Sequence, residues 1–432
     1  MAEETRRSRY PRVVGEDRFS RGRAGTLRAV LDRLVRLQGQ PTSRARLARD
    51  LGLSKTTVSS VVDDCVQVGL LQEAEDRGYP NSRGRPAVPF AFTPGAVVVG
   101  GVELGLTKLR MVLADPGGRI LSDSELDSPG LHARPVDYVD MIGAGMEALL
   151  AEAGIARGRL LGIGVGTPGL ADPAEGVIRA AYDFDWYDVP LGPMLTERTG
   201  VPVVLANRGK MGALGEYEQG EGRGRQNVVY IRLGTGVTGG MILAGELYWG
   251  SVGAGEAIGH ILAVPDGELC GCGSRGCLMT VASMPALSRR VRRLLKRGEP
   301  SVVHDIVGGD LSRIDGTIVL EAARAGDPTC LSVIREAGER IGVVVSGLVN
   351  LLSPDVVVIG GPMSAAGEPL MQAIRQSLRE HTLSYLYNHV DIVPTRLGSR
   401  AGAVGAVYYV LRYTPLLADY VMQAALRAPS GA

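Results

Sequence analysis

Three cysteines and a histidine form the group of side chains with the clearest chemistry in this sequence. Cys270, Cys272 and Cys277 fall within eight residues, and His260 lies ten positions before the first of them. Three thiolates and one imidazole are the ligand set of a tetrahedral structural zinc site, and four protein ligands leave no open position for catalysis. The alternative is reduced thiols on a flexible loop. We predict a structural zinc ion, because the intervening glycines let the backbone turn tightly enough for the sulfurs to converge.

Small polar side chains near the N-terminus indicate a second kind of chemistry. An amphipathic helix starts near residue 24, residues 44–51 predict a short second helix, and Gly52 allows a tight turn after it. Ser54 then caps a third helix, which has one apolar face and one face of hydroxyls and a lysine. Two short helices around a glycine turn are typical of a helix-turn-helix, whose second helix enters the major groove of DNA.

A hairpin after these helices would form the wing of a winged helix-turn-helix. Strands are expected at 69–74 and 88–92, joined by a loop rich in glycine, serine and arginine. Arginines on such a loop can enter the minor groove. The alternative is a helical scaffold whose polar face is merely solvated. The side chains expected to contact DNA are Arg44, Lys55, Thr56, Thr57, Ser59, Arg83 and Arg85.

Charge and composition are consistent with a basic head on an acidic body. Residues 1–95 hold 17 basic and 11 acidic side chains, whereas the rest of the chain holds 30 basic and 35 acidic ones. No stretch approaches the roughly 20 apolar residues that span a bilayer. The first residues lack the apolar core of a secretory signal, and five cysteines are too few for a disulfide scaffold. We therefore expect a cytoplasmic protein without a membrane segment.

The elements that must position these side chains form an α/β body. Apolar strands that end in glycines are expected at 97–105, 161–169, 228–236 and 356–361, with long helices such as 328–352 between them. Ligands usually bind at such strand ends. The predicted organisation is a flexible basic arm (1–23), a winged helix-turn-helix (24–94), a first lobe (95–206 and 395–432) and a second lobe with the zinc motif (207–394).

Taken together, the motifs resemble those of the ROK family, which comprises repressors, open reading frames and sugar kinases. The resemblance covers almost the whole chain beyond the first residues. It implies a two-lobed, actin-like fold of the sugar kinase and hexokinase type, and a homodimer or a dimer of dimers. The matching segments are the histidine and cysteine motif, 166–169 (GTPG), 233–236 (LGTG), 350–355 (NLLSPD), 359–361 (IGG) and the Gly-Arg-Pro of the wing at 84–86.

The sequence departs from the family's kinases where phosphoryl transfer needs a base. Family kinases carry an Asn-Asp pair there, and in this chain Asn207 is followed by Arg208. A guanidinium cannot accept a proton at biological pH. In the first phosphate loop, Glu103 replaces an aspartate and Leu106 replaces a glycine, so its side chain should obstruct the phosphates. We predict no catalytic residue and no phosphotransferase activity.

The sugar-binding positions are altered as well. Ala257 and Met279 replace two glutamates of the family pattern, which removes two acceptors for sugar hydroxyls. Arg208 and Lys210 add two cations that would favour an acidic or phosphorylated ligand. An ordinary sugar and an empty pocket are the alternatives. The residues expected to bind an effector are Gly169, Asn207, Arg208, Glu256 and His260.

The leading hypothesis is a transcription factor, a repressor that binds a palindromic operator in double-stranded DNA as a dimer. A small effector bound between the lobes would change their closure and hence the spacing of the two heads. Two other classes compete with it. One is a bifunctional regulator that still phosphorylates a sugar, and the other is a zinc-stabilised protein whose head contacts another protein.

Overall fold

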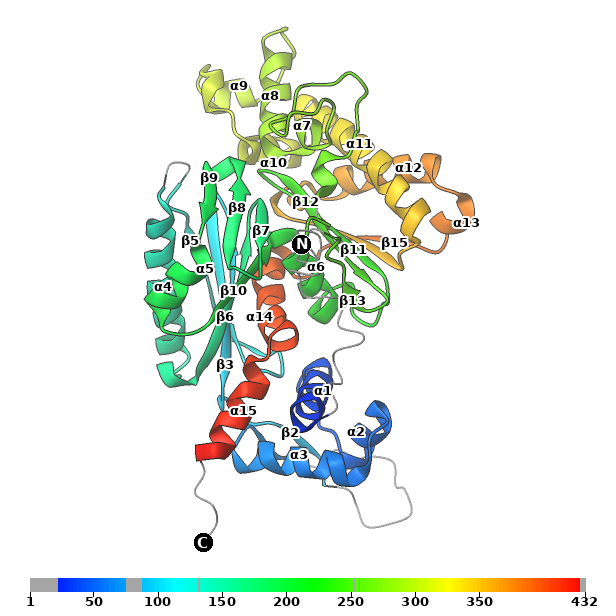
Figure 1. Cartoon of the computed structure of the whole chain (residues 1–432). Helices are drawn as coiled ribbons and strands as arrows, with labels where there is room; N and C mark the ends of the chain where they lie inside the picture. The colour runs from blue at the N-terminus through cyan, green and yellow to red at the C-terminus, as the bar shows by residue number, and fades with distance from the viewer. Residues whose placement is uncertain (1–21, 75–87, 131–132, 252, 256, 428–432) are drawn as a thin grey trace, which may run out of the picture.

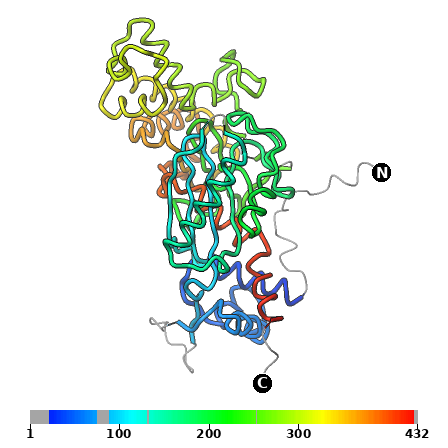
Figure 2. Tube along the Cα trace, turned by 90° about the vertical axis from the view of Figure 1, so that its left-hand side faces the viewer, coloured from blue at the N-terminus to red at the C-terminus, as the bar shows by residue number. Residues whose placement is uncertain are grey.

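The computed structural model describes residues 22–74, 88–130, 133–251, 253–255 and 257–427. It confirms the α/β class, with a small helical head at one end of a two-lobed body (Figure 1). A view from the side keeps the head and the final helix of the chain together at the same end (Figure 2). None of the described helices combines the length and the apolarity that crossing a bilayer requires.

The head contains three helices and a short hairpin. Ser43 and Ser54 each accept a backbone hydrogen bond at the start of a helix, and Gly52 ends α2 in the left-handed conformation (φ 64°) that the turn demands. The apolar faces of the helices form a buried core with Phe90 and Phe92 of the hairpin. Arg83 and Arg85, predicted on the wing, lie outside the described residues. The elements are α1 (Arg23–Arg36), α2 (Arg44–Leu51), α3 (Lys55–Gln67), β1 (Leu71–Glu73) and β2 (Phe90–Phe92).

The first lobe is built on a five-stranded sheet in the order β10-β6-β3-β4-β5. Three strands pair antiparallel, and β6 and β10 then add in parallel. Helices α4 and α5 belong to the same core, and a three-stranded sheet (β7-β8-β9) extends it. The bounds are β3 (Val98–Leu104), β4 (Lys108–Ala114), β5 (Ile120–Asp127), α4 (Pro135–Glu152), η2 (Arg157–Arg159), β6 (Leu160–Thr167), β7 (Leu170–Asp172), β8 (Val177–Ala181), η3 (Tyr182–Phe184), β9 (Trp186–Val189), α5 (Leu191–Thr199) and β10 (Val203–Asn207).

The second lobe repeats this topology with the order β13-β12-β11-β14-β15. Again three antiparallel strands are followed by two parallel ones. Helices α8 and α10–α12 pack with this sheet around a second core. The bounds are β11 (Val228–Leu233), β12 (Val237–Leu243), β13 (Glu246–Leu247), η4 (Ala257–His260), α7 (Met279–Ala282), α8 (Met284–Leu295), α9 (Val303–Ile306), η5 (Leu311–Arg313), α10 (Gly316–Arg324), α11 (Pro328–Leu352), β14 (Val356–Gly360), η6 (Pro362–Ala366), α12 (Glu368–His381), α13 (Ser384–Tyr387) and β15 (Asp391–Pro394).

Two helices lie between the sheets in the centre of the molecule (Figure 1). They are α6 (Arg208–Gln219), which packs on β11 and β12, and α14 (Ala401–Tyr413), which follows η7 (Gly398–Arg400) and packs on β3 and β6. Their backbones approach so closely that a Cβ at Gly405 would collide with the carbonyl oxygen of Met211. The last helix, α15 (Leu416–Arg427), contacts α1 and α3, so the end of the chain also packs against the head.

A buried ionic cluster joins the head to this central pair of helices. The side chain of Arg412, on α14, is fully buried and lies 3.2 Å from Asp32 of the head helix α1. The same guanidinium pairs with Glu218 near the end of α6. On the head side, Arg36 bridges Asp32 (2.9 Å) and Glu246 of β13 (3.0 Å). The head is therefore fixed to the body by charges as well as by the apolar core they share.

Candidate functional site: the interlobe cleft, the cysteine cluster and the head

The first residues of α6 face a cavity of about 340 Å³ between the two lobes. One wall comes from the ends of β6, β8 and β10 in the first lobe. The other comes from the loop before β12, from η4 and from the cysteine segment of the second lobe. The site therefore lies at strand ends, where an α/β body presents its ligands.

Asn207 ties the start of α6 to both lobes. Its side-chain oxygen accepts hydrogen bonds from the backbone N–H of Gly209 (2.7 Å) and the hydroxyl of Thr238 (3.1 Å). Its amide nitrogen donates to the carbonyl oxygen of Gly169 (2.7 Å). The amide thus caps α6 and fixes the position of the residue that follows it.

Arg208 places a buried positive charge in the wall of this cavity. It is only 4% exposed, and among the described residues its guanidinium has no hydrogen-bond or ion-pair partner. A Cβ added to Gly236 would lie 3.8 Å from Arg208 Nη2, 3.5 Å from Asp183 Oδ2 and 3.6 Å from Met279 Cε, so these three side chains converge there. Burial, and then the nearby cation Arg232, lower the pKa of Arg208 to about 9. The guanidinium therefore remains charged at neutral pH.

The cavity brings together most of the positions expected to bind an effector. Gly169, Asn207, Arg208 and His260 all line it, while Glu256 lies outside the described residues. Lys210 does not line the cavity, contrary to the expectation that it would face the same ligand as Arg208. Residues two apart on a helix point to different sides, and the ammonium of Lys210 donates to the carbonyl of Gly253 (2.7 Å).

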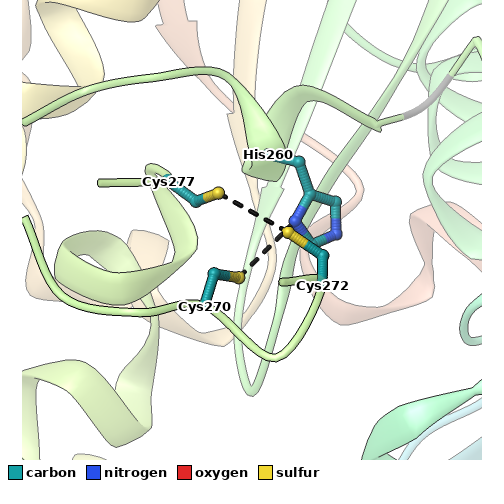
Figure 3. Close-up of side chains that lie close together, drawn as sticks. All are labelled: His260, Cys270, Cys272 and Cys277. Atoms are coloured by element: carbon teal, nitrogen blue, oxygen red, sulfur yellow. Dashed lines mark hydrogen bonds between the residues drawn. The ribbon is translucent and has the colours of Figure 1, made fainter. Parts of the chain in front are cut away.

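The predicted zinc ligands also converge at one place (Figure 3). Their four ligand atoms lie within 4.8 Å of one another, with 3.7 Å between His260 Nδ1 and Cys270 Sγ and between the sulfurs of Cys272 and Cys277. Tetrahedral zinc with ordinary bond lengths places neighbouring ligand atoms about 3.5–3.8 Å apart. Burial lowers the pKa of His260, which favours the neutral imidazole that binds metal. Donor set and spacing therefore fit a structural zinc ion.

In the head, the start of α3 is open to solvent. Lys55, Thr56 and Thr57 are exposed, and Ser59 is half-buried. Arg44 already has partners within the head: it pairs with Asp63 (2.6 Å), and its guanidinium lies over the ring of Phe90. Two cations that were not among the predicted contacts, Arg46 and Arg49 of α2, are exposed instead.

Comparison with known proteins identifies the family. The sequence model of the ROK family matches residues 99–413. The chain belongs to the ROK family. A crystal structure described as a ROK family transcriptional regulator, a homologue of the Escherichia coli MLC protein, superposes with a TM-score of 0.76 at 26% identity, covering 93% of this chain and 100% of that one.

Both regulators and kinases of the family are similar to this chain. The xylose repressor of Caldicellulosiruptor bescii is 27% identical over 89% of this chain and 94% of its own length. A ROK family glucokinase from Streptomyces griseus, solved with glucose and AMPPNP, is 33% identical with a TM-score of 0.63, over 72% of this chain and 98% of its own. These matches confirm the ROK-type, actin-like body. The family match begins at residue 99, after the head.

The position that the ROK pattern assigns to the first phosphate loop is occupied by an internal ion pair. Glu103 at the end of β3 is 3% exposed, and its Oε1 accepts two hydrogen bonds from Arg232 of β11, at 2.8 and 3.2 Å. Because the two residues belong to different lobes, the pair also connects the lobes across the cleft.

Arg232 and Asp183 were both missed by reasoning from the sequence. Asp183 lies in η3, where no motif marks it. Arg232 carries a weak signal, since it is the one charged residue in a buried strand of six and such a residue needs a partner. Its partner Glu103 is 129 residues away, so only the fold could reveal the pair.

Proposed function

We propose that this ROK protein is a sequence-specific transcriptional repressor that binds double-stranded DNA through its head as a homodimer or a dimer of dimers. The observation that carries the proposal is the exposed polar start of α3 within a helix-turn-helix fixed to a ROK body. The regulators among its relatives span the head as well as the body. In this proposal the third helix reads the major groove, and lysines and arginines contact phosphates.

The body then serves as a sensor rather than as an enzyme. Arg208 stands where phosphoryl transfer needs a base, and Glu103 is neutralised by Arg232 instead of facing a nucleotide. We propose that the cleft binds a sugar-related or anionic effector through Gly169, Asn207, Arg208, Glu256 and His260. We also propose a structural zinc ion on His260, Cys270, Cys272 and Cys277.

DNA binding is tested with the full chain and a duplex selected by it from a random library. We expect affinity to fall steeply with salt, because each phosphate contact releases counterions. Lys55→Ala should weaken binding and reduce the slope of log K against log salt by about one. Lys296→Ala is the matched control, because that exposed lysine lies at the end of α8, far from the head (Figure 1). Equal affinities of the two variants, or no binding at low salt, would contradict the proposal.

The second candidate is a bifunctional regulator, which the glucokinase relative favours. An ATP-coupled assay with a panel of hexoses separates the two. We expect no sugar-dependent ADP formation above background, because a missing general base alone costs a factor of about 10²–10⁴. Sugar-dependent turnover that Arg208→Ala abolishes would establish the enzyme instead.

A further inference from the structure

Among the residues that the structure describes, the charges buried around the cleft do not balance. Arg208 and Arg232 are both nearly inaccessible, at 4% exposure each, and the buried carboxylate near them is Glu103. Oε1 of that carboxylate accepts both hydrogen bonds from Arg232, so one buried positive charge remains on Arg208. Nη1 of Arg232 is also buried and has no hydrogen-bond partner within the described part of the chain. Burying a cation without a partner is costly, so such a group indicates a missing anion.

The unpartnered guanidinium faces the cavity. Its Nη2 lies near Gly236, beside Met279, and the residue lines the 340 Å³ space. Among the described residues, Asp183 is the carboxylate that lines the cavity; it is exposed and forms no ion pair with Arg208. An arginine fork matches the paired oxygens of a carboxylate or a phosphate, and a hydrogen bond to an ionised partner is stronger than one to a neutral hydroxyl.

The rest of the cavity limits the size and polarity of the ligand. Its volume is at the lower end of the range for small-molecule sites. Leu170, Tyr182, Val237 and Met279 add apolar surface, while the amide of Asn207 is already used in capping α6. The site therefore suits a compact molecule with a single strong anchor.

We infer that the cleft binds a small carbohydrate-sized ligand that carries a carboxylate or a phosphate group, with Arg208 as its anchor. This inference rests on the proposed function, because it specifies the effector of the proposed regulator. The bound anion supplies the negative charge that the described residues of the buried cluster lack. It sits at the N-terminus of α6, whose other end carries Glu218 and the ionic cluster of the head.

Isothermal titration calorimetry on the full chain tests the inference with three groups of probes. These are hexuronates and aldonates, hexose phosphates, and the corresponding neutral hexoses. We expect at least one anionic group to bind roughly tenfold or more tighter than the neutral hexoses, which corresponds to one charge-assisted interaction. The first two groups distinguish a carboxylate from a phosphate. Equal affinity for a neutral hexose, or no binding by either anionic group at millimolar concentration, would overturn the inference.

Variants of Arg208 distinguish a loss of anion binding from a loss of stability. Arg208→Gln should lower anion affinity about tenfold or more, and Arg208→Lys should retain part of it, because an ammonium keeps the charge but not the fork. Arg119→Gln, on an exposed turn outside the cavity, is the control. Unchanged anion affinity in Arg208→Gln, with a melting temperature equal to that of the wild type, would rule Arg208 out as the anchor.

The same variants keep this inference distinct from the proposed function. Arg208→Gln without ligand should bind the selected duplex like the wild type, because its side chain does not contact the head. Lys55→Ala should lose DNA affinity and keep anion affinity. If neither the wild type nor any variant binds DNA but the anion still binds through Arg208, the proposed regulator function is wrong and the anion site is retained.

Discussion

At the scale of single residues, a guanidinium at the first position of α6 decides what the cleft can do. Arg208 has no lone pair that could accept a proton from a sugar hydroxyl, and even its lowered pKa of about 9 leaves it charged at neutral pH. Asn207, its neighbour, keeps the geometry of the site by capping α6. In our proposal, this change of one side chain on an intact frame replaces proton abstraction by anion recognition.

The cysteine cluster gives the prediction that belongs to this scale. Purified protein should contain about one zinc ion per chain, measured by inductively coupled plasma mass spectrometry, and Cys272→Ser should reduce the content toward zero. Removal of the metal with a strong chelator should lower the melting temperature, because binding energy is coupled to the fold of the segment.

Another cysteine of the same chain provides the control. Cys330 is buried in the second lobe, away from the cluster, and burial raises its pKa to about 12. Cys330→Ser should keep its zinc even if the variant is less stable. Zinc loss in both variants, or in neither, would refute the assignment of His260, Cys270, Cys272 and Cys277 as the ligands.

At the scale of elements, Asp327 fixes the start of the longest helix. Its carboxylate accepts hydrogen bonds from the backbone N–H groups of Cys330 and Val302, both at 2.8 Å, so it caps α11 and holds the segment before α9. Burial opposes ionisation of this carboxyl, but these hydrogen bonds outweigh burial and lower its pKa. Asp327→Ala should cost about 1–2 kcal/mol of unfolding free energy.

The lowered pKa also gives a pH dependence with a definite sign. The ionised Asp327 stabilises the fold at neutral pH, and this contribution is lost as pH falls below the ordinary value of about 3.9 and through the lowered one. Denaturant unfolding of wild type and Asp327→Asn across this range measures it. The stability difference between them should shrink on acidification, and a difference that grows would contradict the role given to the carboxylate.

Elements with strong local signals could be predicted from the sequence, whereas pairings between distant elements could not. The sequence predicted a long helix over 328–352, which is α11 (Pro328–Leu352). Ser54 and Gly52 likewise predicted the turn between α2 and α3. The pair of Glu103 with Arg232 depends on two sheets meeting, and no spacing along the chain encodes it. The orientation of Lys210 away from the cavity was missed although it is a local property, because residues two apart on one helix point to different sides.

At the scale of the whole molecule, α6 spans the distance from the cleft to the head. Its first residue lines the cavity, and its Glu218, about 15 Å further along the helix axis, contacts Arg412. Gln38 of the head donates a hydrogen bond to the backbone carbonyl of Glu218. The repressor that we propose needs its heads held at one spacing, and this junction is where the body holds the head.

The stability of that junction should depend on Arg412. Arg412→Met removes the ion-pair partner of the carboxylate of Glu218, which is 4% exposed, and should cost about 3–5 kcal/mol. Thermal unfolding and hydrogen exchange of the α1 amides measure this loss of stability.

The double variant Arg412→Met/Glu218→Met should recover much of the lost stability, because two apolar side chains need no pairing. Arg225→Met, which breaks the exposed pair with Asp391, should cost less than about 1 kcal/mol. A double variant no more stable than Arg412→Met, or unchanged exchange of α1, would show that the apolar core alone holds the head.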